Sequence, residues 1–342
     1  MNEIQINTIQ SLLEAPKKIA IIGHKSPDGD SMGSCLAIKH LLDKHGHTTY
    51  VFMPDAHANY LDWLPGSTSI LNYQDNQIRI EELLSEIELI FTMDFNSLNR
   101  VGDLQKVLEQ KLQENIPFVM IDHHQTPDDY AVVTYSDPLM SSTSQMVYHF
   151  MECLNWDSLL DKDIATCIYT GILTDTGSFK YRNTTPTTHR VTASLMEAGA
   201  DNLKINNNIF DANSENRLKL LGSALKNLRV LKEYHTAYIT LTQAELNQHH
   251  YQKGDTEGFV NYALSIEGVN LAVIFIENSD EKIIKISLRS KGAFPVNQMA
   301  NKHFHGGGHI NAAGGRSHDN MENTLSYFQS ILKHYKNDLT YE

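Results

Sequence analysis

The chain has 342 residues, 41% of them hydrophobic and 20% charged, which is an ordinary globular composition and favours two domains over one. Its formal net charge of −13 at pH 7 argues against a protein that coats long nucleic acid, because such binding depends on a basic surface. No stretch reaches the roughly 18 uncharged apolar residues of a membrane helix, and none of the three cysteines lies in a C-x-x-C motif.

The N-terminal segment, residues 1–15, has the spacing of an amphipathic helix and contains Glu3 and Glu14. It lacks the basic start and the apolar run of a secretory signal peptide. We therefore expect a cytoplasmic protein that does not contact a membrane. Buried thiols at Cys35, Cys153 and Cys167 would fit such a reducing compartment.

The first half of the chain alternates short apolar runs with helical patterns. Strands are predicted at residues 19–22, 48–53, 88–93 and 118–121, and helices at 31–45 and 103–115. This alternation predicts a parallel α/β sheet. The strands are apolar on both faces, as a parallel sheet covered by helices requires.

The pattern of predicted elements changes in the second half of the chain. Helical spacing continues at residues 142–154, 162–174, 186–198 and 215–226, and strand-like runs follow at 230–242 and 269–288. We expect a parallel-sheet domain with flanking helices at 1–212, a helical linker at 213–230 and a smaller mixed α/β domain at 231–342.

Polar clusters follow three of the predicted strands. Their members are His24, Asp28 and Asp30 after the first strand, Asp94 after another, and Asp122, His123 and His124 after a third. Ligands of an open parallel sheet gather at the carboxyl ends of its strands, so these clusters should converge. A fourth cluster, with Asp175, ends the helix that begins near residue 162.

Carboxylates and imidazoles without a thiolate suit Mn²⁺ or Mg²⁺ better than a structural zinc ion. Pro27 and Gly29 form a tight turn that lets Asp28 and Asp30 point to two different metal ions. Asp94 is the natural candidate to bridge them. Two metal ions about 3.5–4 Å apart can activate a water and neutralise a phosphate during an in-line displacement.

Each cluster also has a structural interpretation. Asp30, which precedes Ser31, could be only a helix N-cap, and a single His–Asp pair is often a simple hydrogen bond. The coincidence of four clusters favours a metal site. The other histidines, including His40, His45 and His47, are expected at the surface.

A glycine-rich motif lies near the end of the chain. Residues 282–309 contain five Lys or Arg and no Asp or Glu, and they end in Gly306, Gly307, Gly308 and His309. Glycines let backbone amides approach an anion, and the following Ala312–Ala313 could begin a helix that favours phosphate. A solvated basic face and a flexible loop are the alternatives. No G-x-x-x-x-G-K-[ST] motif is present, which excludes a P-loop NTPase.

Taken together, these motifs resemble the DHH phosphoesterase family, in the subfamily that carries a DHHA1 domain. The name-giving triplet is 122–124, the first motif runs from His24 to Asp30 and on through Gly33–Ser34, and the fourth covers residues 170–179. The DHHA1 hallmark matches at 306–315. The resemblance covers nearly the whole chain, in the family's order.

Within the family, the motif set is most similar to the small bacterial oligoribonucleases that also dephosphorylate 3′-phosphoadenosine 5′-phosphate. The resemblance implies two divalent cations, with Mn²⁺ preferred, and a short RNA or small nucleotide as substrate. It implies one metal ion held by His24, Asp28 and Asp94, and a second held by Asp30, Asp94, His123 and Asp175. Asp94 and His124 would act in catalysis, while Arg289, Gly306, Gly307, Gly308, His309 and Asn311 would bind the nucleotide.

One departure from the family stands out, because Phe95 follows Asp94 where relatives more often have a Thr whose hydroxyl could support the ligand. Alternative substrates are cyclic or linear dinucleotides, pyrophosphate and polyphosphate. Other classes are a catalytically inactive nucleotide-binding protein and a zinc-stabilised scaffold that unfolds on chelation. A homodimer is compatible with the family resemblance.

Overall fold

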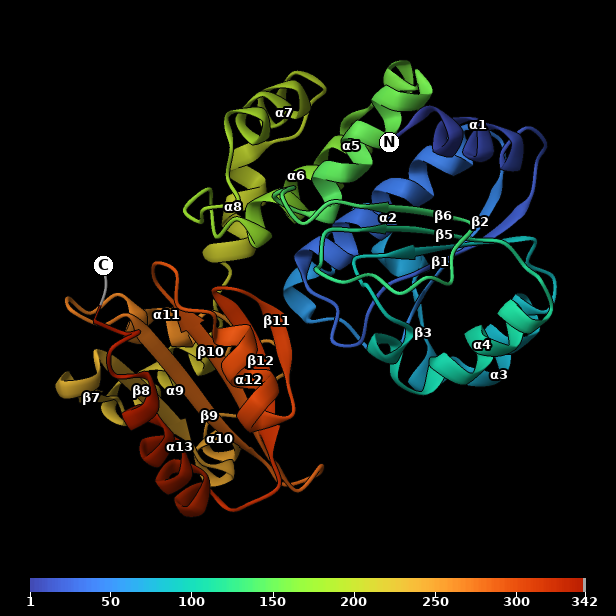
Figure 1. Ribbon diagram of the computed structural model, residues 1–342. Coiled ribbons are helices and arrows are strands. Elements are labelled where there is room, and N and C mark those ends of the chain that lie inside the picture. Colours follow the sequence, from blue (N-terminus) through green and yellow to red (C-terminus); the bar gives the residue numbers. More distant parts are fainter. Residues whose placement is uncertain (341–342) are drawn as a thin grey trace. The chain divides into compact units, whose positions relative to one another are not determined.

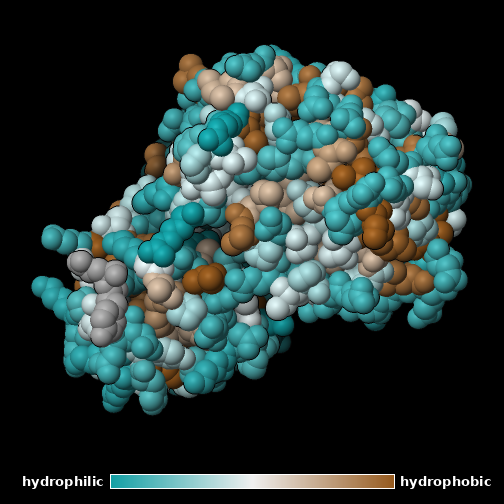
Figure 2. All heavy atoms as spheres, turned by 45° about the horizontal axis from the view of Figure 1, so that its top comes forward, coloured by the Kyte–Doolittle hydropathy of each residue, from teal (hydrophilic) through white to brown (hydrophobic). Residues whose placement is uncertain are grey.

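The computed structural model describes residues 1–340, which fall into two compact units, residues 1–212 and 213–340 (Figure 1). Among the described residues, no helix combines the length and the apolar character needed to cross a membrane. On the face drawn in Figure 2, hydrophilic residues dominate and apolar residues form small separate groups.

The first unit is built on a six-stranded sheet in which every strand pair is parallel. Its order is β3-β2-β1-β4-β5-β6. The strands are β1 (Lys18–Ile22), β2 (Thr48–Met53), β3 (Leu71–Asn72), β4 (Leu89–Met93), β5 (Phe118–Asp122) and β6 (Val133–Ser136). Strands β4 and β5 are buried at every position, which is typical of a parallel sheet covered on both faces. The predicted parallel sheet is confirmed, and the sequence missed only its short edge strands β3 and β6.

Helices cover both faces of this sheet. One face packs on α1 (Glu3–Leu12), α2 (Gly29–Lys44), α5 (Thr143–Leu154) and α6 (Lys162–Asp175), followed by α7 (Pro186–Glu197) and α8 (Asn202–Phe210). The other face packs on α3 (Tyr73–Leu84) and α4 (Gln105–Gln113) (Figure 1). Short 3-10 turns are η1 (Asn59–Leu61), η2 (Ser67–Ser69), η3 (Leu98–Leu104) and η4 (Asp157–Leu159).

Three local expectations fail in the first unit. The helix predicted from residue 103 begins only at Gln105, because residues 103–104 still belong to the 3-10 turn η3, which has a kink at Gly102 (φ 54°). Cys153 is half-buried, whereas Cys35 and Cys167 are buried as expected. His47 was expected at the surface but is 6% exposed, because its ring lies beside Lys17, whose amide donates to Nδ1.

The second unit is a mixed six-stranded sheet in the order β11-β12-β10-β9-β8-β7. Only β8 and β9 run parallel. The strands are β7 (Arg229–Leu231), β8 (Thr236–Leu241), β9 (Leu271–Asn278), β10 (Ile283–Ser290), β11 (Gly307–His309) and β12 (Ala312–Ser317), and η5 (Lys232–Tyr234) joins β7 to β8. The mixed α/β architecture predicted for this part of the chain is confirmed.

Each face of the second sheet has its own apolar core. One core contains residues of α12 (Val296–Phe304) and α13 (Met321–Tyr335). The other contains residues of α9 (Glu215–Lys226), α10 (Gln243–Gln248) and α11 (Phe259–Leu264). Leu220 and Ala224 of α9 are fully buried there, so this helix packs as part of the second unit.

The glycine-rich motif forms a hairpin rather than the start of a helix. Ala312 and Ala313 begin β12, so the prediction of a helix at this position was wrong. Strand β12 pairs with β10 over six residues, and these interstrand hydrogen bonds outweigh the helical preference of two alanines. Gly308 has φ 138°, which disfavours other residues, and a Cβ on Gly306 would lie 2.6 Å from Gly315 Cα.

Candidate metal centre

The candidate ligands of the first unit converge at the carboxyl ends of three adjacent strands. His24 lies just beyond β1, Asp94 follows β4, and Asp122 ends β5. The chain leaves β1 toward β2 on one side and β4 lies on its other side, so the cluster sits where the strand order reverses. This switch point is the usual ligand position of an open parallel sheet.

The start of α2 supplies two carboxylates with different partners. Asp28 is the N-cap, and its Oδ1 accepts the amides of Asp30 (3.0 Å) and Ser31 (3.1 Å). Asp30 is therefore not the N-cap, which excludes that structural interpretation. Its carboxylate instead accepts the Thr143 and Ser144 amides at 2.7 and 2.8 Å, at the N-terminus of α5. These two amides hold the buried Asp30 carboxylate in place.

A first group of potential ligands surrounds His24. Its Nε2 lies 3.4 Å from Asp94 Oδ2 and 3.8 Å from Asp28 Oδ1. The His24 and Asp94 side chains are almost fully buried, whereas the Asp28 side chain is 47% exposed. The three potential ligand atoms lie close enough together to surround one cation. Because the Asp28 side chain is partly exposed, solvent can reach this position.

A second group surrounds His123. Its Nε2 lies 3.6 Å from Asp175 Oδ2 and 3.9 Å from Asp30 Oδ2. The same nitrogen is 3.7 Å from Asp94 Oδ1. Asp94 thus presents Oδ2 to the first group and Oδ1 to the second, which is the position required of a bridging carboxylate.

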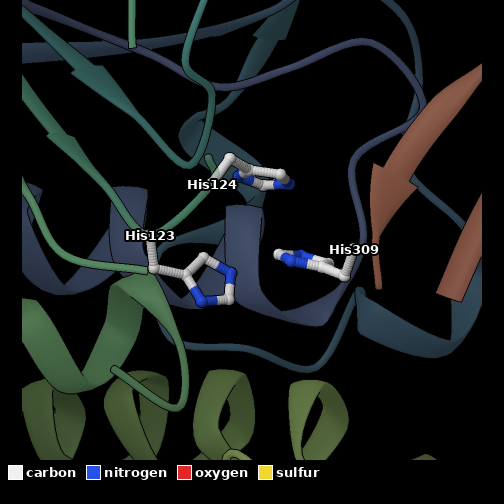
Figure 3. A group of neighbouring side chains, drawn as sticks. All are labelled: His123, His124 and His309. Carbon is white, nitrogen blue, oxygen red and sulfur yellow. The ribbon is translucent and has the colours of Figure 1, made fainter. Parts of the chain in front are cut away.

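The two imidazoles have tautomers suited to ligation. His24 Nδ1 lies 2.9 Å from the Lys25 carbonyl oxygen, and His123 Nδ1 lies 3.3 Å from that of Met140. A carbonyl can only accept, so in the neutral rings Nδ1 holds the proton and Nε2 presents its lone pair. Such a second hydrogen bond is common among metal-binding histidines. Figure 3 shows the rings of His123 and His124 on the segment that follows β5.

His124 has a different environment from its neighbour. Its Nδ1 lies 2.7 Å from Asp122 Oδ1, and its backbone amide donates to Asp122 Oδ2 at 3.0 Å. Asp122 therefore orients the ring, and Asp122 and His124 also lie close enough to Asp94 to form a further group of potential ligands. Burial is the main cause that lowers the pKa of His124, against the opposing effect of Asp122.

The charges of the cluster are poorly balanced by the protein itself. Burial raises the pKa of Asp94 well above its ordinary value, and the nearby carboxylates of Asp30 and Asp28 raise it further. Burial would lower the pKa of His123, but Asp175, Asp94 and Asp30 outweigh it and raise the value to about 9. Such crowding of buried carboxylates fits the binding of divalent cations.

Residues 141–144 belong to the site but were not predicted from the sequence. Thr143 is fully buried, and its hydroxyl lies 2.9 Å from Asp94 Oδ1. The hydroxyl side chain expected at position 95 is thus provided by α5, while Phe95 is buried in the core between the sheet and α3 and α4. The only available signal was four consecutive hydroxyl residues before an apolar helical pattern.

Asn183 is a further unpredicted neighbour of Asp175. Its Nδ2 donates to the Ser141 carbonyl at 2.7 Å and lies 3.5 Å from Asp175 Oδ2. Asp175 ends α6, and the next three residues after Thr176 all have positive φ, from 56° to 64°. This left-handed turn brings the chain back so that Asn183 reaches the carboxylate.

The candidate substrate residues of the second unit lie on β10 and the β11–β12 hairpin. Arg289 is on β10, directly opposite Ala312 of β12, which in turn pairs with His309 of β11. Asn311 donates from Nδ2 to Ser290 Oγ at 2.9 Å and to the Gly292 carbonyl at 3.1 Å. Its side chain therefore fixes the hairpin turn to the end of β10.

Comparisons with known proteins agree with this architecture. The model of the DHH family's N-terminal domain matches residues 18–172, and that of the DHHA1 domain matches 232–335. The bifunctional oligoribonuclease and PAP phosphatase NrnA of Thermus thermophilus is 30% identical over 86% of this chain and 83% of its own length. The cyclic-di-AMP phosphodiesterase PdeA of Listeria monocytogenes is 26% identical over 89% of this chain and 45% of its own.

A solved structure extends the likeness to three dimensions. The crystal structure of an exopolyphosphatase-related protein from Bacteroides fragilis has a TM-score of 0.94 and 38% sequence identity, covering 99% of this chain and 98% of that one. The domain matches, the relatives and this structure all span the two units described above. The chain therefore belongs to the DHH family, and its second unit is a DHHA1 domain.

Proposed function

We propose that this protein is a metal-dependent phosphoesterase that hydrolyses short oligoribonucleotides and 3′-phosphoadenosine 5′-phosphate. The observation that carries the proposal is Asp94, whose two carboxylate oxygens face two separate groups of potential ligands. The relative from Thermus thermophilus, which is named for these two activities, supports the choice of substrates.

The first unit would hold the cations. One would bind His24, Asp28 and Asp94, and the other would bind Asp30, Asp94, His123 and Asp175. Two divalent cations, with Mn²⁺ preferred, would activate the attacking water and neutralise the phosphate.

His124 would act beside these ligands rather than as one of them. Asp122 fixes its ring, so that Nε2 can contact the phosphate or hold a proton during the reaction. Burial lowers the pKa of His124, which favours the neutral ring, whose Nε2 would then accept a proton or a hydrogen bond.

The second unit, residues 231–342, would bind the rest of the nucleotide, and residues 213–230 would link it to the first. Arg289 supplies a guanidinium on the face it shares with His309. Gly307 and Gly308 would let the backbone approach a phosphate closely, whereas Gly306 serves the hairpin, because its amide donates to the Ala300 carbonyl at 3.2 Å. Asn311 would act by fixing the hairpin turn.

A second candidate function is the hydrolysis of cyclic or linear dinucleotides. It is favoured by the similarity to the cyclic-di-AMP phosphodiesterase of Listeria monocytogenes, although this chain spans less than half of that protein. Pyrophosphate and polyphosphate are the less favoured candidates. The glycine-rich DHHA1 motif argues against the dedicated pyrophosphatase branch, whereas the similar structure from Bacteroides fragilis, an exopolyphosphatase-related protein, keeps polyphosphate among the substrates to be tested.

A hydrolysis panel in Mn²⁺ tests the proposal. It compares a 5′-labelled RNA trimer, a 24-nucleotide RNA, 3′-phosphoadenosine 5′-phosphate, cyclic di-AMP, its linear form and pyrophosphate. We expect fast turnover of the trimer and of the bisphosphorylated adenosine, and slow turnover of the long RNA. Cleavage of a cyclic dinucleotide alone would favour the second candidate, because that substrate has no free end.

Asp94→Ala tests the bridging role on the same panel. We expect hydrolysis to be abolished and metal content, measured by plasma mass spectrometry, to fall, while circular dichroism stays unchanged. The matched control is Asp157→Ala, which removes an exposed aspartate of η4. Normal turnover by Asp94→Ala with a full metal content would refute the proposed centre.

A further inference from the structure

One face of the second sheet carries aligned rows of polar and small residues. Directly paired residues of neighbouring strands point to the same face. Arg289, Ala312 and His309 form one row, and Ser287, Gly314 and Gly307 form the next. Lys285 and Arg316 form a third row, since they pair directly on β10 and β12.

This face is open where β12 and β11 form the edge of the sheet. Helices α9, α10 and α11 lie on the same face, but they pack on β8, β9 and β10. Helix α12 contacts β12 and β11 from the opposite face, where Ala313 and Phe304 share a core. Gly314, Lys285 and Arg316 are accordingly exposed.

The middle row leaves a path between the two cationic rows. A Cβ on Gly307 would meet nothing within 4 Å, and one on Gly314 would meet only the Ile286 carbonyl, at 3.8 Å. Packing within the second unit therefore does not demand glycine at either position. The row of Arg289 and the row of Lys285 are four residues apart, which is about 13 Å along an antiparallel strand. One nucleotide is too short to span that distance, but a short oligonucleotide can.

The third row is electrostatically unfavourable for the protein alone. Like charges placed directly opposite each other on neighbouring strands destabilise a sheet. The Glu281 carboxylate lies 3.5 Å from Lys285 Nζ, but both side chains are about half exposed, so this ion pair contributes little. Arg316 has no ion pair within residues 1–340, and a bound anion would relieve the repulsion.

We propose that Lys285 and Arg316 form a second phosphate subsite, which binds a distal phosphodiester of single-stranded RNA substrates longer than a dinucleotide. The inference rests on the proposed function. It adds a source of length preference: Arg289 and the hairpin serve every substrate, whereas the Lys285–Arg316 row serves only those long enough to reach it. Gly307 and Gly314 of the middle row have no side chains, so the sugar–phosphate backbone of the RNA can pass over them from one cationic row to the other.

The test compares Lys285→Ala/Arg316→Ala with the control Lys302→Ala/Lys333→Ala, which removes two positive charges from α12 and α13 on the opposite face. Hydrolysis of a five-nucleotide RNA and of 3′-phosphoadenosine 5′-phosphate is measured at several salt concentrations. For the pentamer, we expect KM to rise on the order of tenfold in the subsite variant and to stay unchanged in the control. The slope of log KM against log salt should fall by roughly 0.7 for each lost phosphate contact.

The mononucleotide substrate, 3′-phosphoadenosine 5′-phosphate, distinguishes loss of the subsite from a general loss of activity. Its kinetics should change by less than twofold in the subsite variant, because it does not reach the third row. An unchanged pentamer KM, or an equal loss on both substrates, would overturn the subsite. If the wild-type protein cleaves neither substrate, the proposed function fails. Fluorescence anisotropy of the labelled pentamer in EDTA then tests the subsite alone. Weaker binding by the subsite variant than by the wild type and the control supports the subsite, and equal binding by all three overturns it.

Discussion

At the scale of single residues, Asp94 shows how a buried candidate ligand is held in place. Its backbone has φ 64°, and its amide donates to the Ile121 carbonyl at 3.0 Å, just beyond the last residue of β4. The Thr143 hydroxyl lies 2.9 Å from Oδ1. A carboxylate that faces two ligand groups needs such fixed partners, because a rotation of its side chain would disturb both groups at once.

We predict that Thr143→Val weakens metal binding and lowers kcat on the order of 10- to 100-fold, the usual effect of losing a hydrogen bond to a metal ligand. Valine has nearly the same shape as threonine, so the buried packing is retained and the hydroxyl is the main loss. Thr143→Ser, which keeps the hydroxyl, should retain most activity. Mn²⁺ titration by calorimetry and single-turnover kinetics measure both effects. Equal losses in the two variants would indicate a packing role instead.

His47 gives a prediction about the pH dependence of stability. Burial lowers its pKa below the ordinary 6.5, helped by the charges of His45 and Lys17. Its Nδ1 accepts the Lys17 amide at 3.2 Å, so protonation there would place two donors against each other. Because the unfolded state binds the proton more readily, the stability present above pH 6.5 is lost as the pH falls below that value.

His47→Gln removes the titrating ring but keeps a polar side chain. We expect the free energy of unfolding of the wild type to decrease more steeply than that of the variant between pH 7 and pH 5. Urea unfolding at several pH values measures the difference. All carboxylates are common to both proteins and so cancel in the comparison. Parallel pH profiles would contradict the assignment of this loss to His47.

At the scale of elements, α2, α5 and α6 approach one another closely beside the candidate metal centre. A Cβ on Gly33 would lie 2.5 Å from the Cys167 carbonyl oxygen of α6. A Cβ on Gly171 would overlap Ser144 Oγ of α5 and lie 2.6 Å from Asp30 Oδ1. Glycines at these positions let α5 present its N-terminal amides to the Asp30 carboxylate.

Gly171→Ala should therefore destabilise the protein by about 1–3 kcal/mol, the range for overpacking, and should lower Mn²⁺ affinity by displacing Asp30. Gly222→Ala is the matched control, because this exposed position of α9 has nothing within 4 Å of the new Cβ. Alanine favours a helix over glycine by up to about 1 kcal/mol, so the control should be neutral or stabilising. Denaturant unfolding measures both. Similar stability of the two variants would argue against the close helix contact.

At the scale of the whole molecule, each unit has apolar cores of its own that do not depend on a metal ion. The first unit has one core on each face of its parallel sheet, and so has the second. The candidate ligands lie at the end of the first sheet rather than within these cores. Loss of the cations would leave the cores intact while exposing the repulsion among Asp28, Asp30, Asp94 and Asp175.

Chelation with EDTA should accordingly abolish hydrolysis but leave both units folded. Far-UV circular dichroism, which reports on both units, should be unchanged at 25 °C. Both tryptophans, Trp63 and Trp156, belong to the first unit, so their fluorescence reports its thermal unfolding alone. That midpoint should fall, since cations that bind only the folded state stabilise it. Loss of the dichroism signal in EDTA would instead indicate a structural metal site.

The sequence by itself determined the parallel sheet, the mixed second domain and the candidate ligands at the strand ends. These features depend on short-range patterns, because apolar runs define buried strands and the residue after a strand must lie at its carboxyl end. The glycine motif was recognised in the sequence, but the hairpin that it forms was not predicted. Two alanines favour a helix locally, and only the pairing of β12 with β10 and β11 overrides that preference.

Only the tertiary structure decided which residues support the candidate ligands and which basic residues share a face. Thr143 reaches Asp94 across 49 positions of the sequence, and Asp30 accepts amides 113 and 114 residues away. Similarly, the acid-free stretch 282–309 is not one surface: Lys285 and Arg289 share a strand face, whereas Lys302 lies on α12. Such long-range contacts depend on helix packing and strand register, which no local pattern specifies.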